Sequence, residues 1–198
     1  MKRFNDILSK NKENYIKNLE DLIIISKIIT NSVQNYLLDK FTSLNCIIDD
    51  YNYDPKSVEL VEEFAIDLKQ GSSPERAIVA RHKGESDGKN LMLFSHPDTE
   101  KYVHDDGWNH DPFEPKIINK RLHGWGIADD LAGVAMMYHC LDLIKKSGIR
   151  LKGDLILVSA PSKNHARGIA SVLCKGYTAE SALYLHPAES GNGLEDIK

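Results

Sequence analysis

Three short apolar runs constrain most strongly what this chain can fold into. Residues 91–94, 155–158 and 182–185 hold almost no polar side chain. A strand with one face in water alternates apolar and polar residues, whereas a strand buried on both faces does not. Helical patterns lie between the runs, as in strand–helix–strand crossovers. The sequence therefore predicts a three-layer α/β/α domain with a mixed, largely parallel sheet.

Apolar spacing also predicts the other elements. Helices are expected over residues 3–29, 33–42 and 58–68 and from residue 131 onward. Strands are expected at residues 46–48, 77–82 and 116–123, and a turn at residues 51–55. We expect the strand at 77–82 to form an antiparallel hairpin with the strand that ends near His96.

Composition limits the partners and the compartment. A chain of 198 residues can bury the core of one domain, and its net charge of −4 gives no reason to expect nucleic acid or an anionic membrane as partner. No apolar run is long enough to span a bilayer, and the polar start shows no signal peptide. Cys46, Cys140 and Cys174 lack metal-binding spacing and cannot all pair with one another. Free thiols favour a cytoplasmic location.

A glycine-rich bend precedes one of the helices. Gly124 and Gly126 flank the bend, and Asp129 and Asp130 follow at the start of the helix predicted from residue 131. Carboxylates at a helix start are stabilised by the helix dipole, so a capping role alone would account for them. Backbone without Cβ also lets a ligand approach closely. The bend is therefore a candidate binding element.

Two histidines follow predicted strands directly. His96 begins a His-Pro-Asp segment after the first apolar run, and His186 comes directly after the last one. In an extended segment, Asp98 lies on the same side as His96, where it can accept a hydrogen bond from the second ring N–H of a metal-bound histidine. Ligands of such sheets bind outside the carboxyl ends of the strands. His96, Asp129 and His186 are therefore expected to converge at one rim.

Three motifs in this order, residues 93–99, 108–115 and 124–130, resemble the zinc aminoacylase family. That family includes acetylornithine deacetylase, succinyl-diaminopimelate desuccinylase, glutamate carboxypeptidase and related di- and tripeptidases. The resemblance extends from about residue 21 to the end of the chain. It implies a zinc-peptidase-like, two-zinc amidohydrolase in which His96 is a metal ligand, Asp98 orients His96, and Asp129 bridges the two metals.

The chain departs from the family pattern in two places. Family members carry a Glu-Glu pair, a general base and a metal ligand, where this chain has Lys163 and Asn164, and residues 160–168 contain no carboxylate. His165 is then the candidate in this loop for a base or a ligand, the alternative being an exposed loop histidine. His186 stands where many members have an acidic residue. Imidazole is a good zinc ligand, and the alternative is a strand-end histidine that makes one backbone hydrogen bond.

The resemblance also sets the expected organisation and function. We expect residues 1–198 to be the N-terminal part of a metallohydrolase catalytic domain, a fragment without the family's lid and dimerisation domain. The expected function is a metal-dependent amidohydrolase, a peptidase or N-acyl amino acid deacylase that uses a metal-activated water. One or two zinc ions, with cobalt or manganese as alternatives, would act on a small peptide or N-acyl amino acid.

Other interpretations remain open at this point. Since the Glu-Glu pair is missing, the alternative function is a non-catalytic metal- or ligand-binding relative. An interaction protein that uses only the N-terminal helices is a third interpretation. A homodimer would form through the domain that this chain lacks.

Overall fold

The computed structural model describes residues 2–27, 31–60, 74–103, 107–161 and 166–186. The helices are α1 (Lys2–Ser26), α2 (Ser32–Ser43), α3 (Ala132–Ser147) and α4 (Arg167–Cys174), and a short 3-10 helix covers Pro55–Ser57. The strands are β1 (Ile47–Tyr53), β2 (Glu75–His82), β3 (Leu91–Ser95), β4 (Lys116–Ile118), β5 (Arg121–His123), β6 (Leu155–Ser159) and β7 (Ser181–Tyr184).

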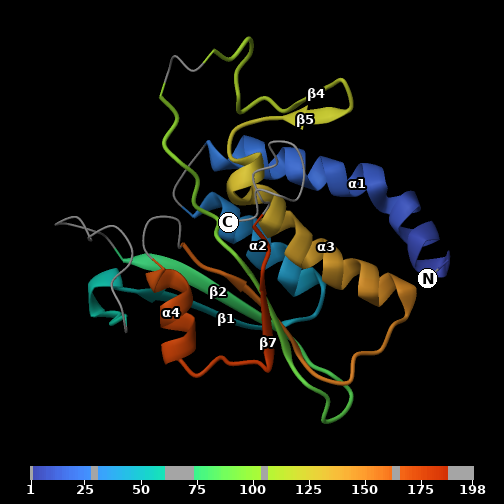
Figure 1. Cartoon of the computed structure of the whole chain (residues 1–198), viewed down its shortest axis with the longest axis vertical. Coiled ribbons are helices and arrows are strands. Elements are labelled where there is room, and N and C mark those ends of the chain that lie inside the picture. Colours follow the sequence, from blue (N-terminus) through green and yellow to red (C-terminus); the bar gives the residue numbers. More distant parts are fainter. Residues whose placement is uncertain (1, 28–30, 61–73, 104–106, 162–165, 187–198) are drawn as a thin grey trace, which may run out of the picture.

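Five strands form one mixed sheet in the order β1-β2-β6-β3-β7 (Figure 1). Strands β6, β3 and β7 run parallel to one another, while β2 is antiparallel to both β1 and β6. The parallel half holds the three apolar runs, and every residue of β6 is buried. The predicted α/β class with a mixed sheet is confirmed.

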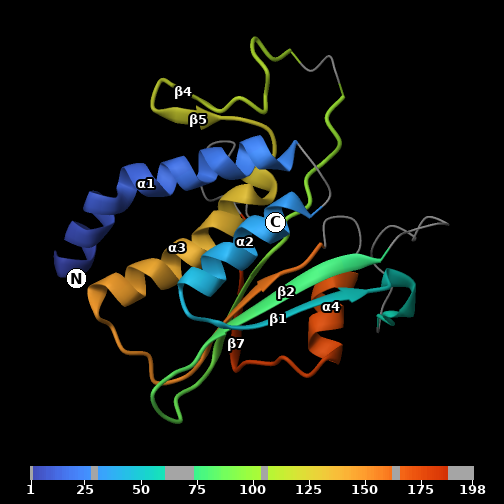
Figure 2. The same ribbon diagram turned by 180° about the vertical axis from the view of Figure 1, so that it is seen from behind.

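Helices cover both faces of this sheet, as Figures 1 and 2 show from opposite sides. Successive residues of β6 point to opposite faces, so Leu157 joins the core under α1, α2 and α3, while Val158 joins a second core. In that second core, Val172 of α4 packs beside Val79 of β2. Burial on both faces explains why β6 lacks polar alternation. The same explanation does not hold for β7, which lies at the edge of the sheet and whose residues are exposed.

The expected hairpin between residues 77–82 and the strand before His96 is wrong. Strand β6 lies between β2 and β3, antiparallel to the first and parallel to the second. The connection from β2 to β3 crosses the start of β6, where the Gly84 amide donates to Asp154 Oδ1 and the Asp154 amide donates to Asn90 Oδ1, both at 2.8 Å. The connection is therefore held against β6 and does not close a hairpin.

Other elements differ from the expectation in their bounds. The first strand continues to Tyr53 through the expected turn, because Tyr51 and Tyr53 pack on the core under α4. The single strand expected at residues 116–123 is a hairpin of β4 and β5, in which Asn119 and Lys120 have φ values of 51° and 64°. Most of the helix expected at residues 58–68 lies outside the described residues. Among those described, no helix is both long and apolar enough to cross a membrane.

Burial of His139 between α1 and α3 predicts a pH-dependent stability. Burial lowers the pKa of His139 to about 4, from an ordinary value of 6.5, and the charges of Lys40 and Lys146 act in the same direction, against Asp142. Asn18 Nδ2 lies 3.2 Å from His139 Nε2, which suits a neutral ring that accepts the hydrogen bond. The unfolded chain therefore binds a proton at a higher pH than the folded chain does.

This stabilising contribution is complete above about pH 6.5 and is lost as the pH falls towards about 4. With 1.36 kcal/mol for each unit of pKa difference, and allowing for partial exposure of the ring, we expect a loss of about 2 kcal/mol. Urea unfolding at pH 7 and pH 4.5 measures it, and His139→Phe should remove that part of the pH dependence. An unchanged pH dependence in this variant would contradict the assignment.

Candidate metal centre

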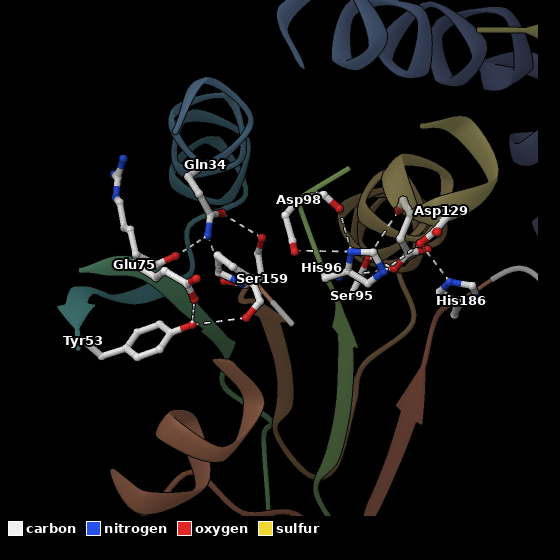
Figure 3. A network of polar contacts seen from close by, with 12 residues as sticks. Gln34, Tyr53, Glu75, Ser95, His96, Asp98, Asp129, Ser159 and His186 are labelled. Carbon is white, nitrogen blue, oxygen red and sulfur yellow. Dashed lines mark hydrogen bonds and ion pairs between the residues drawn. The ribbon is translucent and has the colours of Figure 1, made fainter. Parts of the chain in front are cut away.

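The candidate site lies at the carboxyl ends of β3 and β7, where parallel strands and the start of α3 meet (Figure 3). His96 directly follows β3, and His186 follows β7 after one intervening residue. Asp129 belongs to the irregular segment Ile127–Leu131, which leads into α3 and in which Asp129 has a non-helical backbone. The two aspartates therefore precede α3 and do not lie in its regular first turn.

Three side chains converge at this rim. Asp129 Oδ1 lies 3.1 Å from His96 Nε2 and 3.1 Å from His186 Nε2. One ligand atom from each residue lies within 4.8 Å of the others. His96 is 2% exposed, whereas Asp129 and His186 keep 42% and 33% of their side chains accessible. The expected convergence of the three side chains is present, and their role as metal ligands stays a prediction.

A fixed hydrogen bond orients the His96 ring. Its Nδ1 lies 2.9 Å from the backbone carbonyl oxygen of Asp98 and 3.4 Å from the Asp98 carboxylate. A carbonyl oxygen only accepts, so Nδ1 carries the proton, and in the neutral ring the lone pair is on Nε2, which faces Asp129. The donor set is therefore suited to a divalent cation: two imidazole nitrogens and one carboxylate oxygen.

Charge around His96 compensates for its burial. Burial alone would lower the pKa of His96, but the hydrogen bond and charge of Asp98, together with the charge of Asp130, raise that pKa above its ordinary value. The site thus attracts positive charge at the ring that faces Asp129. This is the electrostatic environment that a bound cation requires.

The buried Asp130 carboxylate holds the backbone at His96 in place, a role that the sequence alone did not predict. Its side chain is fully buried, Ser95 Oγ donates to Oδ2 at 2.5 Å, and the His96 amide donates to the same oxygen at 3.3 Å. Burial raises the pKa of Asp130, and the Ser95 hydroxyl and His96 oppose this shift. Asp130 therefore ties the end of β3 to the start of α3. The sequence feature that could have indicated this role is the adjacent pair Asp129 and Asp130.

An aromatic side chain borders both histidines. The Tyr184 ring stacks on Phe94 with 4.6 Å between centroids and an interplanar angle of 3°. The same ring lies 6.2 Å from the His96 ring and 5.2 Å from the His186 ring. Neighbouring strands β3 and β7 thus place an aromatic support beside the two imidazoles. His165, the other candidate from the sequence, lies outside the described residues.

The fold and the site together define a class of protein, an α/β domain with a candidate metal centre at the carboxyl ends of its parallel strands. Residues 92–195, just over half of the chain, match the family described as Peptidase family M20/M25/M40. The chain belongs to this family, which confirms the resemblance seen in its motifs. The matched segment contains His96, Asp98, Asp129 and His186.

Two curated relatives illustrate the range of this family. The chain is 32% identical over 123 residues to an N-formyl-4-amino-5-aminomethyl-2-methylpyrimidine deformylase of Bacillus subtilis, which covers 61% of this chain and 29% of that protein. It is 39% identical over 82 residues to carboxypeptidase G2 of a Pseudomonas species, with 41% of this chain and 18% of the relative covered. The chain thus spans less than a third of either protein.

A solved structure has the same fold. The M20 family metallo-carboxypeptidase of Sulfolobus solfataricus superposes with a TM-score of 0.60 at 15% identity, over 86% of this chain and 36% of that one. At this level of identity the comparison concerns the fold, and it agrees with a mixed sheet between two helical layers.

The geometry around His96 predicts the effect of removing the Asp98 side chain. Loss of a partner that orients a metal-binding histidine typically weakens metal affinity about 10–100-fold. The Asp98 backbone carbonyl would still hold Nδ1 in Asp98→Ala, so we expect a loss near the lower end, about 10-fold. Competition for zinc with a chelator measures it, and Asp98→Asn, which keeps the shape without the charge, is the control. Equal zinc affinity in the native chain and Asp98→Ala would remove the carboxylate from the site.

Proposed function

We propose that this chain carries the metal-binding part of an amidohydrolase, which removes an acyl group from nitrogen or hydrolyses a small peptide. The observation that carries the proposal is the convergence of His96, Asp129 and His186 within 4.8 Å at the strand ends. Membership of the M20/M25/M40 family supports it. The names of the two relatives, a deformylase and a carboxypeptidase, both denote hydrolysis of a bond between a carbonyl carbon and nitrogen.

In this proposal His96, Asp129 and His186 hold a divalent ion, with zinc as the first choice and cobalt or manganese as alternatives. The chemistry that such an ion supplies is Lewis acidity, which polarises a carbonyl and lowers the pKa of water. His96 contributes Nε2 because Asp98 holds the proton on Nδ1. Asp129 contributes the one negative charge among the three ligands, and the Tyr184 ring lies beside both imidazoles.

The proposed substrates are small peptides or N-acyl amino acids, including N-formyl compounds. Residues 160–168 contain no carboxylate, so the proton acceptor of the reaction is proposed to be His165. A cytoplasmic location and a homodimer formed through a further domain stay predictions. The alternative is a non-catalytic metal-binding protein, and the experiment must distinguish it from an amidohydrolase.

The test has two measurements on the same zinc-loaded protein. Chelator competition gives the affinity for zinc, cobalt and manganese, and a panel of N-formyl and N-acetyl amino acids and dipeptides gives the release of free amine. Metal-dependent amine release supports the proposal. Tight metal binding without release on any substrate would support the non-catalytic alternative, and no metal binding would contradict both.

A further inference from the structure

The inward face of α2 carries a buried amide, that of Gln34, which is 2% exposed. The other buried residues of this helix are apolar: Val33, Leu37 and Phe41. A buried amide destabilises a fold unless its polar atoms find partners. Gln34 Nε2 donates to the Arg76 carbonyl at 2.8 Å and to the Ser159 carbonyl at 3.1 Å, and Gln34 Oε1 accepts from Ser159 Oγ at 2.7 Å. The amide therefore makes three hydrogen bonds to two strands.

These hydrogen bonds lie where β6 ends. The ladder between β2 and β6 stops at the pair Ile78 and Ser159, because Ser159 is the last residue of β6. Arg76 precedes Ile78 by two residues on β2 and so lies beyond the end of β6, where its carbonyl accepts from Gln34. Gln34 thus takes the place of a further strand residue and holds the end of β6 against β2.

Ser159 connects this anchor to the candidate metal centre (Figure 3). It pairs with Ser95, the last residue of β3, and His96 follows Ser95 directly. The Ala160 amide donates to the Ser95 carbonyl at 3.3 Å, so the two strands stay joined up to the edge of the site. A shift of the Ser159 main chain would therefore displace the main chain that carries His96.

The two paired serines have equivalent places in the sheet. Paired residues of parallel strands point to the same face, and Ser95 and Ser159 are 2% and 0% exposed. Ser95 Oγ donates to Asp130 Oδ2 at 2.5 Å, just as Ser159 Oγ donates to Gln34. Each strand end is thus fixed to a different helical segment, β3 to the residues before α3 and β6 to α2.

We propose that Gln34 is a positioning residue for the candidate metal centre, which acts on His96 through Ser159 and the end of β3. This inference rests on the proposed function, because it concerns a ligand assigned there. Substitutions along a connected network of packed strands and hydrogen bonds change the energetics of a site by a factor of about 2 to 30. We expect Gln34→Leu, which keeps most of the bulk and none of the hydrogen bonds, to weaken zinc binding by about 2- to 30-fold.

Two measurements separate positioning from a purely structural role. Chelator competition gives the zinc affinity, and the visible absorption of the cobalt-loaded chain reports the coordination geometry. We expect shifted cobalt bands in Gln34→Leu, whereas a purely structural role would lower the free energy of unfolding and leave the spectrum of the folded protein unchanged. The matched control is Asn18→Leu, which also removes a buried helix amide, one that contacts His139 and Tyr36. It should keep the native zinc affinity and cobalt spectrum.

Ser159→Ala tests the route from Gln34 to the site. It removes only the hydroxyl that donates to Gln34, so we expect a smaller loss of zinc affinity, about 2-fold. Because Gln34 acts through Ser159, the two substitutions should not be additive, and the double variant should lose no more affinity than Gln34→Leu alone. Ser159→Ala also decides the matter if Gln34→Leu does not fold, and native zinc affinity and cobalt bands in it would then overturn the inference.

The remaining outcomes distinguish this inference from the proposed function. A folded Gln34→Leu protein with native zinc affinity and native cobalt bands would overturn the inference alone, and so would additive losses in the double variant. A native chain that binds neither zinc nor cobalt would contradict the proposed function and, with it, the inference.

Discussion

Asp129→Ala is expected to lower the zinc affinity of this chain by more than about 100-fold, beyond the range for the loss of an orienting partner. Asp129 Oδ1 is the atom common to both 3.1 Å contacts, one with His96 and one with His186. Without it, the three proposed ligands become two neutral imidazoles with no anion to offset the charge of the cation. Chelator competition measures the loss.

The matched control for this variant is Asp111→Ala. It also removes one partly exposed carboxylate from a loop, but Asp111 is paired with Lys27 outside the three proposed ligands. We expect its zinc affinity to stay within about 2-fold of the native value, because exposed ion pairs contribute little. A native-like zinc affinity in Asp129→Ala would exclude Asp129 as a ligand and, with it, the proposed metal centre.

The sequence predicted the elements of the fold better than their partners. The apolar runs that became β3 and β6 carry a local signal, since burial removes polar residues from a strand, whereas the apolar run that became the edge strand β7 is exposed. No comparable pattern in the sequence shows which strand pairs with β2. That pairing depends on distant contacts, such as the buried hydrogen bond from Ser159 Oγ to Gln34 Oε1, which joins the end of β6 to α2. Strand order therefore could not be read from adjacent residues.

The sequence likewise predicted only part of the candidate site. His96 and His186 could be placed together because both follow parallel strands, whose carboxyl ends share one rim. Which of two adjacent aspartates is buried could not be deduced, because the irregular backbone at Asp129 and Asp130 decides it. The closest partner of the His96 ring was also hidden, since it is the main-chain oxygen of Asp98 and any residue would supply that atom.

Gly133→Ala tests how tightly α3 is packed against the candidate metal centre. An added Cβ at Gly133 would lie 1.8 Å from the carbonyl oxygen of Leu185 and 2.4 Å from Asp130 Oδ1. Neither atom belongs to a flexible side-chain end: the first is backbone directly before His186, and the second is part of a fully buried carboxylate. The methyl group therefore has to displace the end of β7 or the base of the site.

Gly133→Ala is expected to lower the free energy of unfolding, whereas a glycine-to-alanine substitution inside an ordinary helix raises it. Replacing glycine by alanine inside a helix normally stabilises a protein by about 0.5–1 kcal/mol. At Gly133 we expect the free energy of unfolding in urea to fall by about 1–3 kcal/mol, the usual range for overpacking. Zinc affinity should fall by about 10–100-fold, as after loss of an orienting partner, because displacement of Leu185 moves His186 away from Asp129. Met136→Ala, on the exposed face of the same helix, is the control and should leave zinc affinity unchanged. A Gly133→Ala protein at least as stable as the native chain, with native zinc affinity, would show that α3 and β7 are not held in this close contact.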